Sequence, residues 1–232
     1  MPPTCLTHWL GTVEYEQAWR LQEALATEIG HGQRPPTLLL LEHPHTYTFG
    51  RGGLAENLLW NASELAQRGV SVHWVDRGGD VTYHGPGQLV GYPLLPLTPG
   101  NLLAQPGRIP QADYIGYLRK LEAMLIAALS ELGVAGERLP GLTGVWVQPG
   151  PAKLASIGVK VDARGVTRHG FALNVNPDMH YWEGIIACGI RDYPSTSLAE
   201  LLETPPAMEQ VVQAVTPAFG ETFGYEMVSQ PL

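Results

Sequence analysis

The sequence predicts a single domain that combines α-helices with a β-sheet. Its 232 residues suit one domain with a sizeable core. Apolar residues recur at helical spacing over residues 115–132, and residues 154–175 alternate with a period of two, as strands do. The sequence contains no internal repeat, low-complexity tract or linker, so we expect one domain over residues 1–232.

The N-terminal part is predicted to contain a helix and a buried strand. Thr12 is a favourable N-cap for the helix, whose apolar stripe runs to Ile29, and Gly30 ends it. The aliphatic run in residues 37–43 is typical of a strand buried on both faces. Residues 44–53 are rich in turn formers, which predicts a loop.

The rest of the chain is predicted to alternate between strands and helices. Residues 115–132 have the strongest helical pattern. Residues 154–161 are typical of the first strand of a hairpin and residues 162–165 of its turn; the strand that follows places His169, Phe171, Leu173 and Val175 on one face. A helix is also predicted over residues 63–67 and a strand over residues 70–75. Short helices are predicted over residues 179–184 and 197–203, and Ser197 and Glu200 form a capping box for the second of these. The last helix is predicted to begin at Pro205.

The composition narrows the possible functions. The formal net charge of −8 argues against nucleic-acid binding. Two cysteines, Cys5 and Cys188, are too few for a disulfide framework. No signal peptide is evident, and the longest aliphatic run, Leu38–Leu41, is far too short to span a membrane. We therefore expect a soluble cytoplasmic protein that does not act on membranes.

Basic residues are unevenly distributed. No Lys or Arg follows Arg191, whereas four basic residues fall within sixteen positions: Lys153, Lys160, Arg164 and Arg168. Such a cluster is usually solvated charge on the strands of a surface hairpin. The alternative is a docking patch for an acidic partner, formed by the Arg164 and Arg168 region.

The stretch from Arg77 to Tyr92 is the most informative part of the chain. It holds five glycines around the strand-forming residues 81–83, which predicts a turn, a short strand, a second turn and a buried strand over residues 89–95. Polar side chains interleave with the glycines, and backbone without side chains can lie close to a ligand. We interpret this stretch as part of a binding site rather than as a purely structural turn.

Two histidines precede this stretch, at positions 43 and 45. Alternate residues of a strand point to opposite faces, so His43 and His45 are not expected to share a ligand. No further ligand lies at a recognisable zinc spacing. We therefore predict no metal site, and treat His43 as a possible polar support for the binding site.

Three motifs together resemble those of the lipoyl/octanoyl transferases of lipoate biosynthesis. The first is Arg-Gly-Gly-x-x-Thr-aromatic-His-x-x-Gly-Gln-x-aliphatic-x-Tyr, met in full by residues 77–92. The second is Lys-x-Ala-x-Ile-Gly at residues 153–158, and the third is Cys-Gly-Ile at residues 188–190. Ala187 stands where the family commonly has proline, which affects the rigidity of that loop more than its chemistry.

The resemblance implies a fold and a reaction. The fold is a single α+β catalytic domain, with a largely antiparallel sheet flanked by helices, like the catalytic core of biotin- and lipoate-protein ligases. Cys188 is the implied nucleophile, which carries the octanoyl group as a thioester. Lys153 is its implied partner, because a nearby cation favours the thiolate; Lys160 is a weaker candidate. No cofactor is implied.

The resemblance also implies the substrate-binding residues and the partners. The residues expected around the acyl chain are Arg77, Gly78, Gly79, Asp80, Val81, Thr82, Tyr83, His84, Ser156, Ile157, Gly158, His169, Gly170 and Phe171. Among them His84 is expected to face the substrate carbonyl, and Phe171 to offer apolar surface. The implied donor is octanoyl-acyl carrier protein. The implied acceptors are lipoyl domains of 2-oxoacid dehydrogenases and the H protein of glycine cleavage.

Three other functions remain open at this stage. An ATP-dependent lipoate- or biotin-protein ligase shares the fold but needs no cysteine nucleophile. A non-catalytic module that binds carrier protein has no need of both Cys188 and Lys153. A cysteine hydrolase with His84 or His169 as its base is the third, but neither histidine lies in a recognised hydrolase motif.

Overall fold

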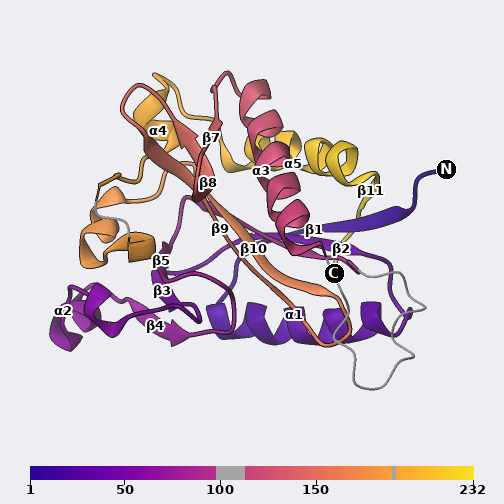
Figure 1. Ribbon diagram of the computed structural model, residues 1–232, viewed down its shortest axis with the longest axis horizontal. Coiled ribbons are helices and arrows are strands. Elements are labelled where there is room, and N and C mark those ends of the chain that lie inside the picture. Colours follow the sequence, from indigo (N-terminus) through magenta and orange to yellow (C-terminus); the bar gives the residue numbers. More distant parts are fainter. Residues whose placement is uncertain (98–112, 190–191) are drawn as a thin grey trace.

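The computed structural model describes residues 1–97, 113–189 and 192–232, except the side chain of Cys188. Ile190, the last residue of the Cys-Gly-Ile motif, lies outside the described residues. A large sheet runs through the molecule, with α1 on one face and α3 and α5 on the other (Figure 1). The helices are α1 (Tyr15–Gly30), α2 (Ala62–Gln67), α3 (Tyr114–Glu131), α4 (Leu198–Leu201) and α5 (Met208–Phe223), with short 3-10 helices η1 (Ala55–Asn57), η3 (Met179–Gly184) and η4 (Ala187–Gly189).

The large sheet is mixed but mostly antiparallel. In spatial order its strands are β11 (Glu226–Ser229), β1 (Thr4–Thr12), β2 (Thr37–Glu42), β6 (Gln88–Leu94), β10 (Thr167–Asn174), β9 (Ala152–Val161), β8 (Leu142–Val147) and β7 (Glu137–Leu139). Only β1 pairs in parallel, with β11 and with β2. The predicted hairpin is the β9–β10 pair, and the strand buried on both faces is β2.

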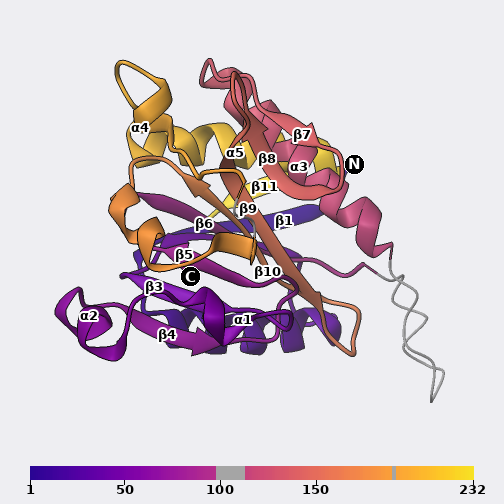
Figure 2. The same cartoon turned by 60° about the vertical axis from the view of Figure 1, so that its left-hand side comes forward.

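A second, small sheet packs beside the end of α1 (Figure 2). Its order is β4 (Ser71–Trp74), β3 (Thr46–Phe49) and β5 (Val81–His84). The two sheets are joined by the turn between β5 and β6, which carries the chain from the small sheet into the centre of the large one. The glycine-rich stretch therefore lies where the two sheets meet.

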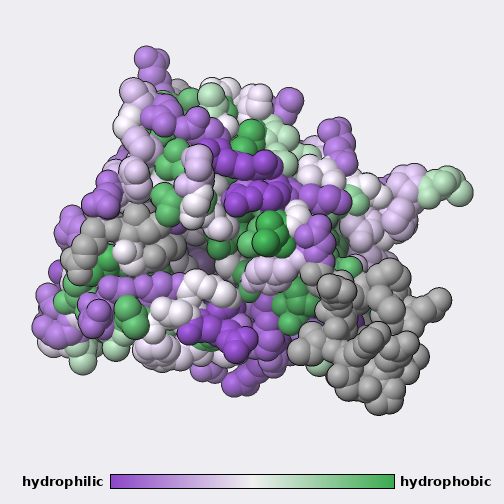
Figure 3. All heavy atoms as spheres, viewed as in Figure 1, coloured by the Kyte–Doolittle hydropathy of each residue, from purple (hydrophilic) through white to green (hydrophobic). Residues whose placement is uncertain are grey.

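Three hydrophobic clusters hold these layers together. One lies between the large sheet and helices α3 and α5, and includes Leu40, Leu121 and Val215. A second lies between the same sheet and α1, and a third fills the small sheet. On the surface seen in Figure 3, hydrophobic residues occur as separate patches among hydrophilic ones. None of the helices in the described ranges combines the length and apolarity that a membrane crossing requires.

Several predicted boundaries are wrong for identifiable reasons. Thr12 does not cap α1, because it is the last residue of β1, and the helix starts at Tyr15 without a side-chain cap. Residues 44–53 were expected to form a loop but contain β3, which pairs with strands on both sides. Ser197 makes no capping hydrogen bond, since Glu200 accepts one from the hydroxyl of Thr196 instead. The last helix begins at Met208, after Pro205 rather than at it.

Candidate active site

The glycine-rich stretch folds as the sequence predicts, and its backbone forms hydrogen bonds with the loop after β3. The amides of Arg51 and Gly52 donate hydrogen bonds to the carbonyls of Arg77 (2.9 Å) and Gly79 (3.0 Å). Gly79 has a φ of +85°, a left-handed conformation that glycine adopts without strain. These glycines allow two backbone loops to pack directly against each other.

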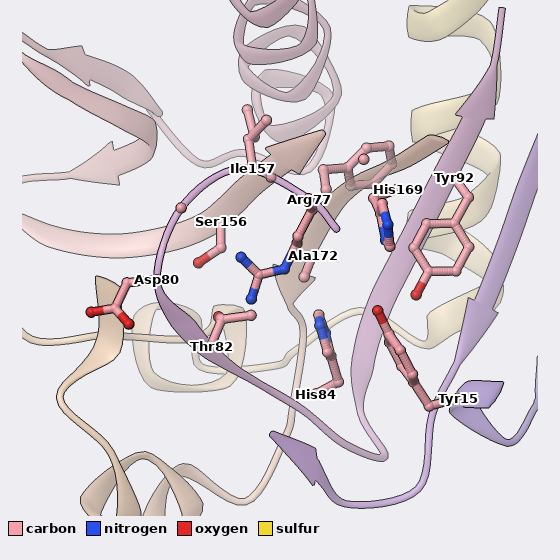
Figure 4. Close-up of a pocket in the computed structure, with 14 residues that line it drawn as sticks. Tyr15, Arg77, Asp80, Thr82, His84, Tyr92, Ser156, Ile157, His169 and Ala172 are labelled. Atoms are coloured by element: carbon pink, nitrogen blue, oxygen red, sulfur yellow. The ribbon is translucent and has the colours of Figure 1, made fainter. Parts of the chain in front are cut away.

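A small pocket, partly open to solvent, lies between this stretch, the β9–β10 hairpin and the start of α1 (Figure 4). The residues that line it are Tyr15, Arg77, Gly79, Asp80, Thr82, His84, Tyr92, Ser156, Ile157, Gly158, His169, Gly170, Phe171 and Ala172. Most of the residues predicted to bind substrate thus meet around one pocket, although they come from two distant parts of the sequence.

Three residues predicted for the pocket lie beside it instead. The side chains of Val81 and Tyr83 belong to the hydrophobic cluster of the small sheet. The amide of Gly78 donates a hydrogen bond to the carbonyl of Val159 (3.0 Å), which ties the glycine-rich stretch to β9. These residues support the pocket wall without lining it.

Three lining residues were not predicted: Tyr15, Tyr92 and Ala172. Tyr15 and Ala172 occupy apolar positions of a helix and a strand, where the sequence pattern indicates only burial. Tyr92 ends the first motif, but its aromatic side chain fits a core position equally well. In Figure 4 the hydroxyls of Tyr15 and Tyr92 point toward the same region as His84 and His169.

Small residues at paired positions of β9 and β10 form the floor of the pocket. Ser156 pairs with Ala172, and Gly158 pairs with Gly170. The next residue along β9, Ile157, points the other way, toward the core cluster that α3 covers (Figure 4). The absence of large side chains on the pocket face of these two strands leaves room for a ligand above the sheet.

Phe171 packs its ring into the core rather than into the pocket. It pairs with Gly91 of β6, and its ring occupies the space that a side chain at Gly91 would need. The ring belongs to the cluster that includes Leu121 of α3. Phe171 is still among the residues that line the pocket, so it borders the ligand space although most of its ring is buried in the core.

His169 lies on the opposite side of β10 from the one that its alternation predicts. Its φ of +56° turns its side chain toward α1, between Trp19 and Tyr92, whereas Phe171 faces α3 and α5. The amide of His169 donates a hydrogen bond to Oε1 of Gln22 on α1 (2.7 Å). Burial lowers the pKa of His169, although Asp76 opposes this shift, so the imidazole is neutral at physiological pH.

Asp76 organises this side of the pocket and was missed by sequence reasoning. Its Oδ1 accepts a hydrogen bond from Nε2 of His169 (2.8 Å), and its Oδ2 accepts from Arg168 (2.6 Å) and Lys160. Burial raises the pKa of Asp76, but the hydrogen bonds from His169 and Lys160 and the charge of Arg168 outweigh it and hold the pKa well below the ordinary range. A single carboxylate therefore ties the glycine-rich stretch to β9 and β10.

Most residues of the basic cluster are engaged in ion pairs or buried. Arg168 is only 5% exposed and its guanidinium bonds Glu23 (2.7 Å) as well as Asp76. Lys160 pairs with Asp76, and Lys153 is 6% exposed. Arg164 is the most exposed member, and it lies 3.6 Å from Asp162. The cluster therefore forms a partly exposed ion-pair network, and docking of an acidic partner at Arg164 stays a prediction.

His84 is held at both ring nitrogens. Nδ1 donates to Oε1 of Gln88 (2.9 Å), because the amide of that glutamine donates elsewhere. Nε2 accepts from the hydroxyl of Thr48 (3.3 Å), which itself accepts from Arg77 (2.9 Å). Burial lowers the pKa of His84 well below its ordinary value. In this tautomer Nε2 carries no proton, and the role of His84 toward the substrate carbonyl stays a prediction.

His43 holds Tyr92 in place, as a support residue would. Its Nδ1 donates to the carbonyl of Val13 (2.6 Å), and its Nε2 accepts from the hydroxyl of Tyr92 (2.7 Å). Burial lowers the pKa of His43 to about 4. His45 points away and stacks on Tyr181 with ring centroids 3.8 Å apart. Among the residues that the structure describes, no group of histidine, cysteine or acidic side chains could hold a metal ion.

A chain neighbour of Cys188 and a β-bridge partner of Lys153 line one open groove. Cys188 is the middle residue of η4, and its neighbour Ala187 lines an open groove beside the pocket. Ser195 lines the same groove and forms a β-bridge with Lys153, whose Nζ lies 4.8 Å from the ring centroid of Trp146. The side chain of Cys188 lies outside the described part of the structure, so the pairing of its sulfur with Lys153 stays a prediction.

Comparison with known proteins identifies close relatives. Residues 14–220 match the family described as the lipoyl protein ligase A/B catalytic domain. The chain is 47% identical over 223 residues to an octanoyltransferase of Chloroflexus aurantiacus, covering 96% of both chains. It is 43% identical over 225 residues to an octanoyltransferase of Acidobacterium capsulatum, covering 94% of this chain and 90% of the relative.

Solved structures with the same fold are more distant in sequence. A bipartite lipoate protein ligase from Thermoplasma acidophilum superposes with a TM-score of 0.72 at 15% identity, and the match covers 100% of this chain and 88% of the ligase chain. A biotin protein ligase from Aquifex aeolicus superposes with a TM-score of 0.50 at 14% identity, and the match covers 96% of this chain and 69% of the ligase. These likenesses confirm the predicted α+β fold. Taken with the full-length relatives, they show that the chain belongs to the lipoyl protein ligase A/B catalytic-domain family and, within it, to the octanoyltransferases.

Proposed function

We propose that this protein transfers an octanoyl group from octanoyl-acyl carrier protein to a lysine of a lipoyl domain, through a thioester on Cys188. Two observations support the proposal. The relatives named octanoyltransferase match nearly the whole chain. The observation that carries the most weight is geometric: on either side of Cys188 in η4, Ala187 lines the open groove and Gly189 lies against Asp80, which lines the pocket.

The first half-reaction exchanges one thioester for another. The Cys188 thiolate attacks the carbonyl carbon of the donor, and the carbon–sulfur bond to the carrier breaks as the carrier leaves as a thiolate. Lys153 favours the Cys188 thiolate by its charge and then gives a proton to the departing sulfur. Little driving force is required because both bonds are thioesters, so positioning determines the rate.

The second half-reaction forms an amide. The neutral lysine amine of the acceptor attacks the acyl-enzyme carbonyl, and the bond to Cys188 breaks. Lys153, now neutral, takes the proton that the amine must lose, which restores the starting state. An amide is more stable than a thioester, so no ATP is required.

The pocket suits the acyl chain and the groove suits the acceptor. The chain would lie over the small residues Ser156 and Ala172, against the rings of Tyr15 and Tyr92. Burial of the chain contributes about 0.8 kcal/mol per methylene. The acceptor lysine would enter along the groove that Ala187 lines. We infer that the acceptors are lipoyl domains of 2-oxoacid dehydrogenases and the H protein of glycine cleavage.

Intact-mass measurement after incubation with octanoyl-acyl carrier protein tests this proposal. We expect a gain of one octanoyl group, mapped by peptide analysis to Cys188 and released on addition of a lipoyl domain. The Cys188→Ala variant should gain nothing. No mass gain in the unaltered protein, or a gain at another residue, would contradict the proposal.

The ATP-dependent ligase reaction is the main alternative. Lipoate-protein ligase A, solved with bound ATP, has the same fold, but at 15% identity this likeness bears on the fold alone. Incubation of a lipoyl domain with free octanoate and ATP separates the two functions. Modification that requires ATP and survives in Cys188→Ala would favour the ligase.

A further inference from the structure

Residues 54–59 run alongside the loop that carries Cys188. The carbonyl of Asn57, at the end of η1, accepts a hydrogen bond from the amide of Ile186 (2.9 Å). The amide of Leu59 donates to the carbonyl of Gly184 (2.8 Å), and Leu58 forms a β-bridge with Ile185. The segment that leads into η4 is thus paired along its length with a chain segment far away in sequence.

The side chain of Asn57 connects this loop to the edge of the pocket. Asn57 is only 6% exposed, and its amide nitrogen donates a hydrogen bond to Oδ2 of Asp80. Oδ1 of Asp80 accepts from the amides of Leu54 (3.1 Å) and Val81 (2.7 Å). The carboxylate is therefore engaged by the protein itself, and in Figure 4 it lies apart from Thr82 and the tyrosine hydroxyls. Although Asp80 borders the pocket, its carboxylate serves to join residues 54–57 to the glycine-rich stretch.

The residue after Cys188 completes the contact. A Cβ placed on Gly189 would lie 3.2 Å from Oδ2 of Asp80 and 3.8 Å from Nδ2 of Asn57. Gly189 has a φ of +67°, which other residues rarely adopt. Contacts to Asn57 therefore lie on both sides of Cys188. Two residues before it, Ile186 binds the Asn57 carbonyl, and one residue after it, Gly189 packs against the Asn57–Asp80 pair.

We propose that Asn57 is a positioning residue that sets where the Cys188 thiol lies relative to the acyl pocket. This inference rests on the proposed role of Cys188. The carbonyl of Asn57 holds Ile186, the residue before η4, and its side-chain amide holds the Asp80 carboxylate against which Gly189 packs. Loss of the side-chain contact releases one end of a short loop, and small misplacements of a reacting atom cost large factors in rate.

The test compares Asn57→Ala with Asn61→Ala as a matched control. Asn61 is close in sequence and also makes local hydrogen bonds, since it caps α2 through the amides of Ser63 and Glu64. It is not among the contacts of η4 described above. We expect Asn57→Ala to lower the rate of acylation by octanoyl-acyl carrier protein at least tenfold, and Asn61→Ala to stay within about twofold of the unaltered protein.

Alkylation by iodoacetamide provides a readout that a change in stability alone would not move. The chain has two cysteines, and Cys5 is fully buried, with a pKa that burial raises to about 12, so labelling reports Cys188. We expect the dependence of the alkylation rate on pH to change in Asn57→Ala and not in Asn61→Ala. Loss of labelling in Cys188→Ala confirms the assignment of the signal.

Asn57→Asp keeps the size and the backbone contact but turns the donor into an acceptor facing Asp80. We expect slow acylation at neutral pH and recovery relative to the unaltered protein as pH falls, because a protonated carboxyl can donate again. This variant serves if Asn57→Ala does not fold. Acylation and alkylation unchanged in both Asn57 variants would overturn the inference while leaving the proposed function intact. Failure of the unaltered protein to be acylated at Cys188 would instead overturn the proposed function.

Discussion

Nε2 of His169 donates a hydrogen bond to Oδ1 of Asp76 at 2.8 Å, joining residues 93 positions apart in the chain. Asp76 immediately precedes the glycine-rich stretch, and His169 begins the pocket-lining part of β10. The same carboxylate also binds Arg168 and Lys160. The two walls of the pocket are therefore held at a fixed separation by one charged group that itself lies outside the pocket.

Replacement of Asp76 by Asn should make stability less sensitive to acid. The folded protein holds the pKa of Asp76 below its ordinary value of 3.8, so its stabilisation is complete above that pH and is lost as pH falls below it. Asn keeps the shape but does not titrate. Urea denaturation should show the variant to be less stable at pH 7 and to lose less stability than the unaltered protein between pH 5 and pH 3.

Asp178→Asn is a suitable control for this prediction. Asp178 is an exposed carboxylate that caps η3 through the amide of His180 (3.0 Å). We expect its acid response to match that of the unaltered protein. If Asp76→Asn and the unaltered protein lost the same stability between pH 5 and pH 3, Asp76 would not be the source of the pH dependence.

His43 should make the folded state more stable as pH rises from 4 to 6.5. Its pKa is about 4 in the folded protein against 6.5 for an exposed imidazole, so the unfolded chain binds more protons in this range. The free energy of unfolding should rise by on the order of 3 kcal/mol over this pH range. Denaturation midpoints measured across this range should rise less steeply in His43→Gln. His31, which is exposed, provides the control: His31→Gln should keep the slope of the unaltered protein.

Local patterns in the sequence predicted much of the fold. The α3 helix and the β9–β10 hairpin follow directly from apolar spacing, because each buries a whole face against the same core cluster. Strand β11 was missed because its four residues are mostly exposed and carry no alternation. Strand β1 was missed for a related reason: its buried and exposed positions do not alternate regularly.

The site was harder to predict than the fold, because its contacts are distant in sequence. The motifs identified most residues around the pocket. Asp76 has no local signal, since its partners lie 84 to 93 residues away. The face of His169 was predicted wrongly, because a single positive φ breaks the alternation of its strand. Asn57 lies outside the three motifs, and only the packing of η4 reveals its contacts.

Lys153 should be required for transfer more than for folding. Lys153→Ala removes the group that is proposed to move the proton, and such groups contribute about 10² to 10⁴ in rate. Lys153→Arg keeps the charge that favours the thiolate but exchanges no proton. The carrier sulfur can leave as a thiolate and take its proton from solvent, whereas the attacking amine needs a base, so we expect acyl-enzyme to form more slowly and then to persist after a lipoyl domain is added. Intact mass over time separates the two steps. Lys120→Ala, on the exposed face of α3, should behave as the unaltered protein.

Gly170 should tolerate no side chain, whereas the nearby Gly52 should. A Cβ on Gly170 would collide with the carbonyl oxygen of Gly91 and approach Cδ of Pro93 to 2.6 Å, so β6 and β10 would be forced apart. The nearest atom to a Cβ on Gly52 is 3.4 Å away, an ordinary contact. We expect Gly170→Ala to cost about 2 kcal/mol or more in the free energy of unfolding. Equal denaturation midpoints for the two variants would contradict the tight packing of these strands.

The size of the side chain at Ala172 should limit the length of the acyl chain. Ala172 belongs to the floor of the pocket, and Val at this position adds two methyl groups to the space that the chain is proposed to occupy. Two methylenes are worth about 1.6 kcal/mol, so octanoyl should lose about a tenfold advantage over hexanoyl in kcat/KM. The control is Ala152→Val on β9, which is not among the residues that line the pocket and should leave the ratio unchanged. An unaltered ratio in Ala172→Val, with hexanoyl- and octanoyl-acyl carrier protein compared directly, would place the acyl chain elsewhere.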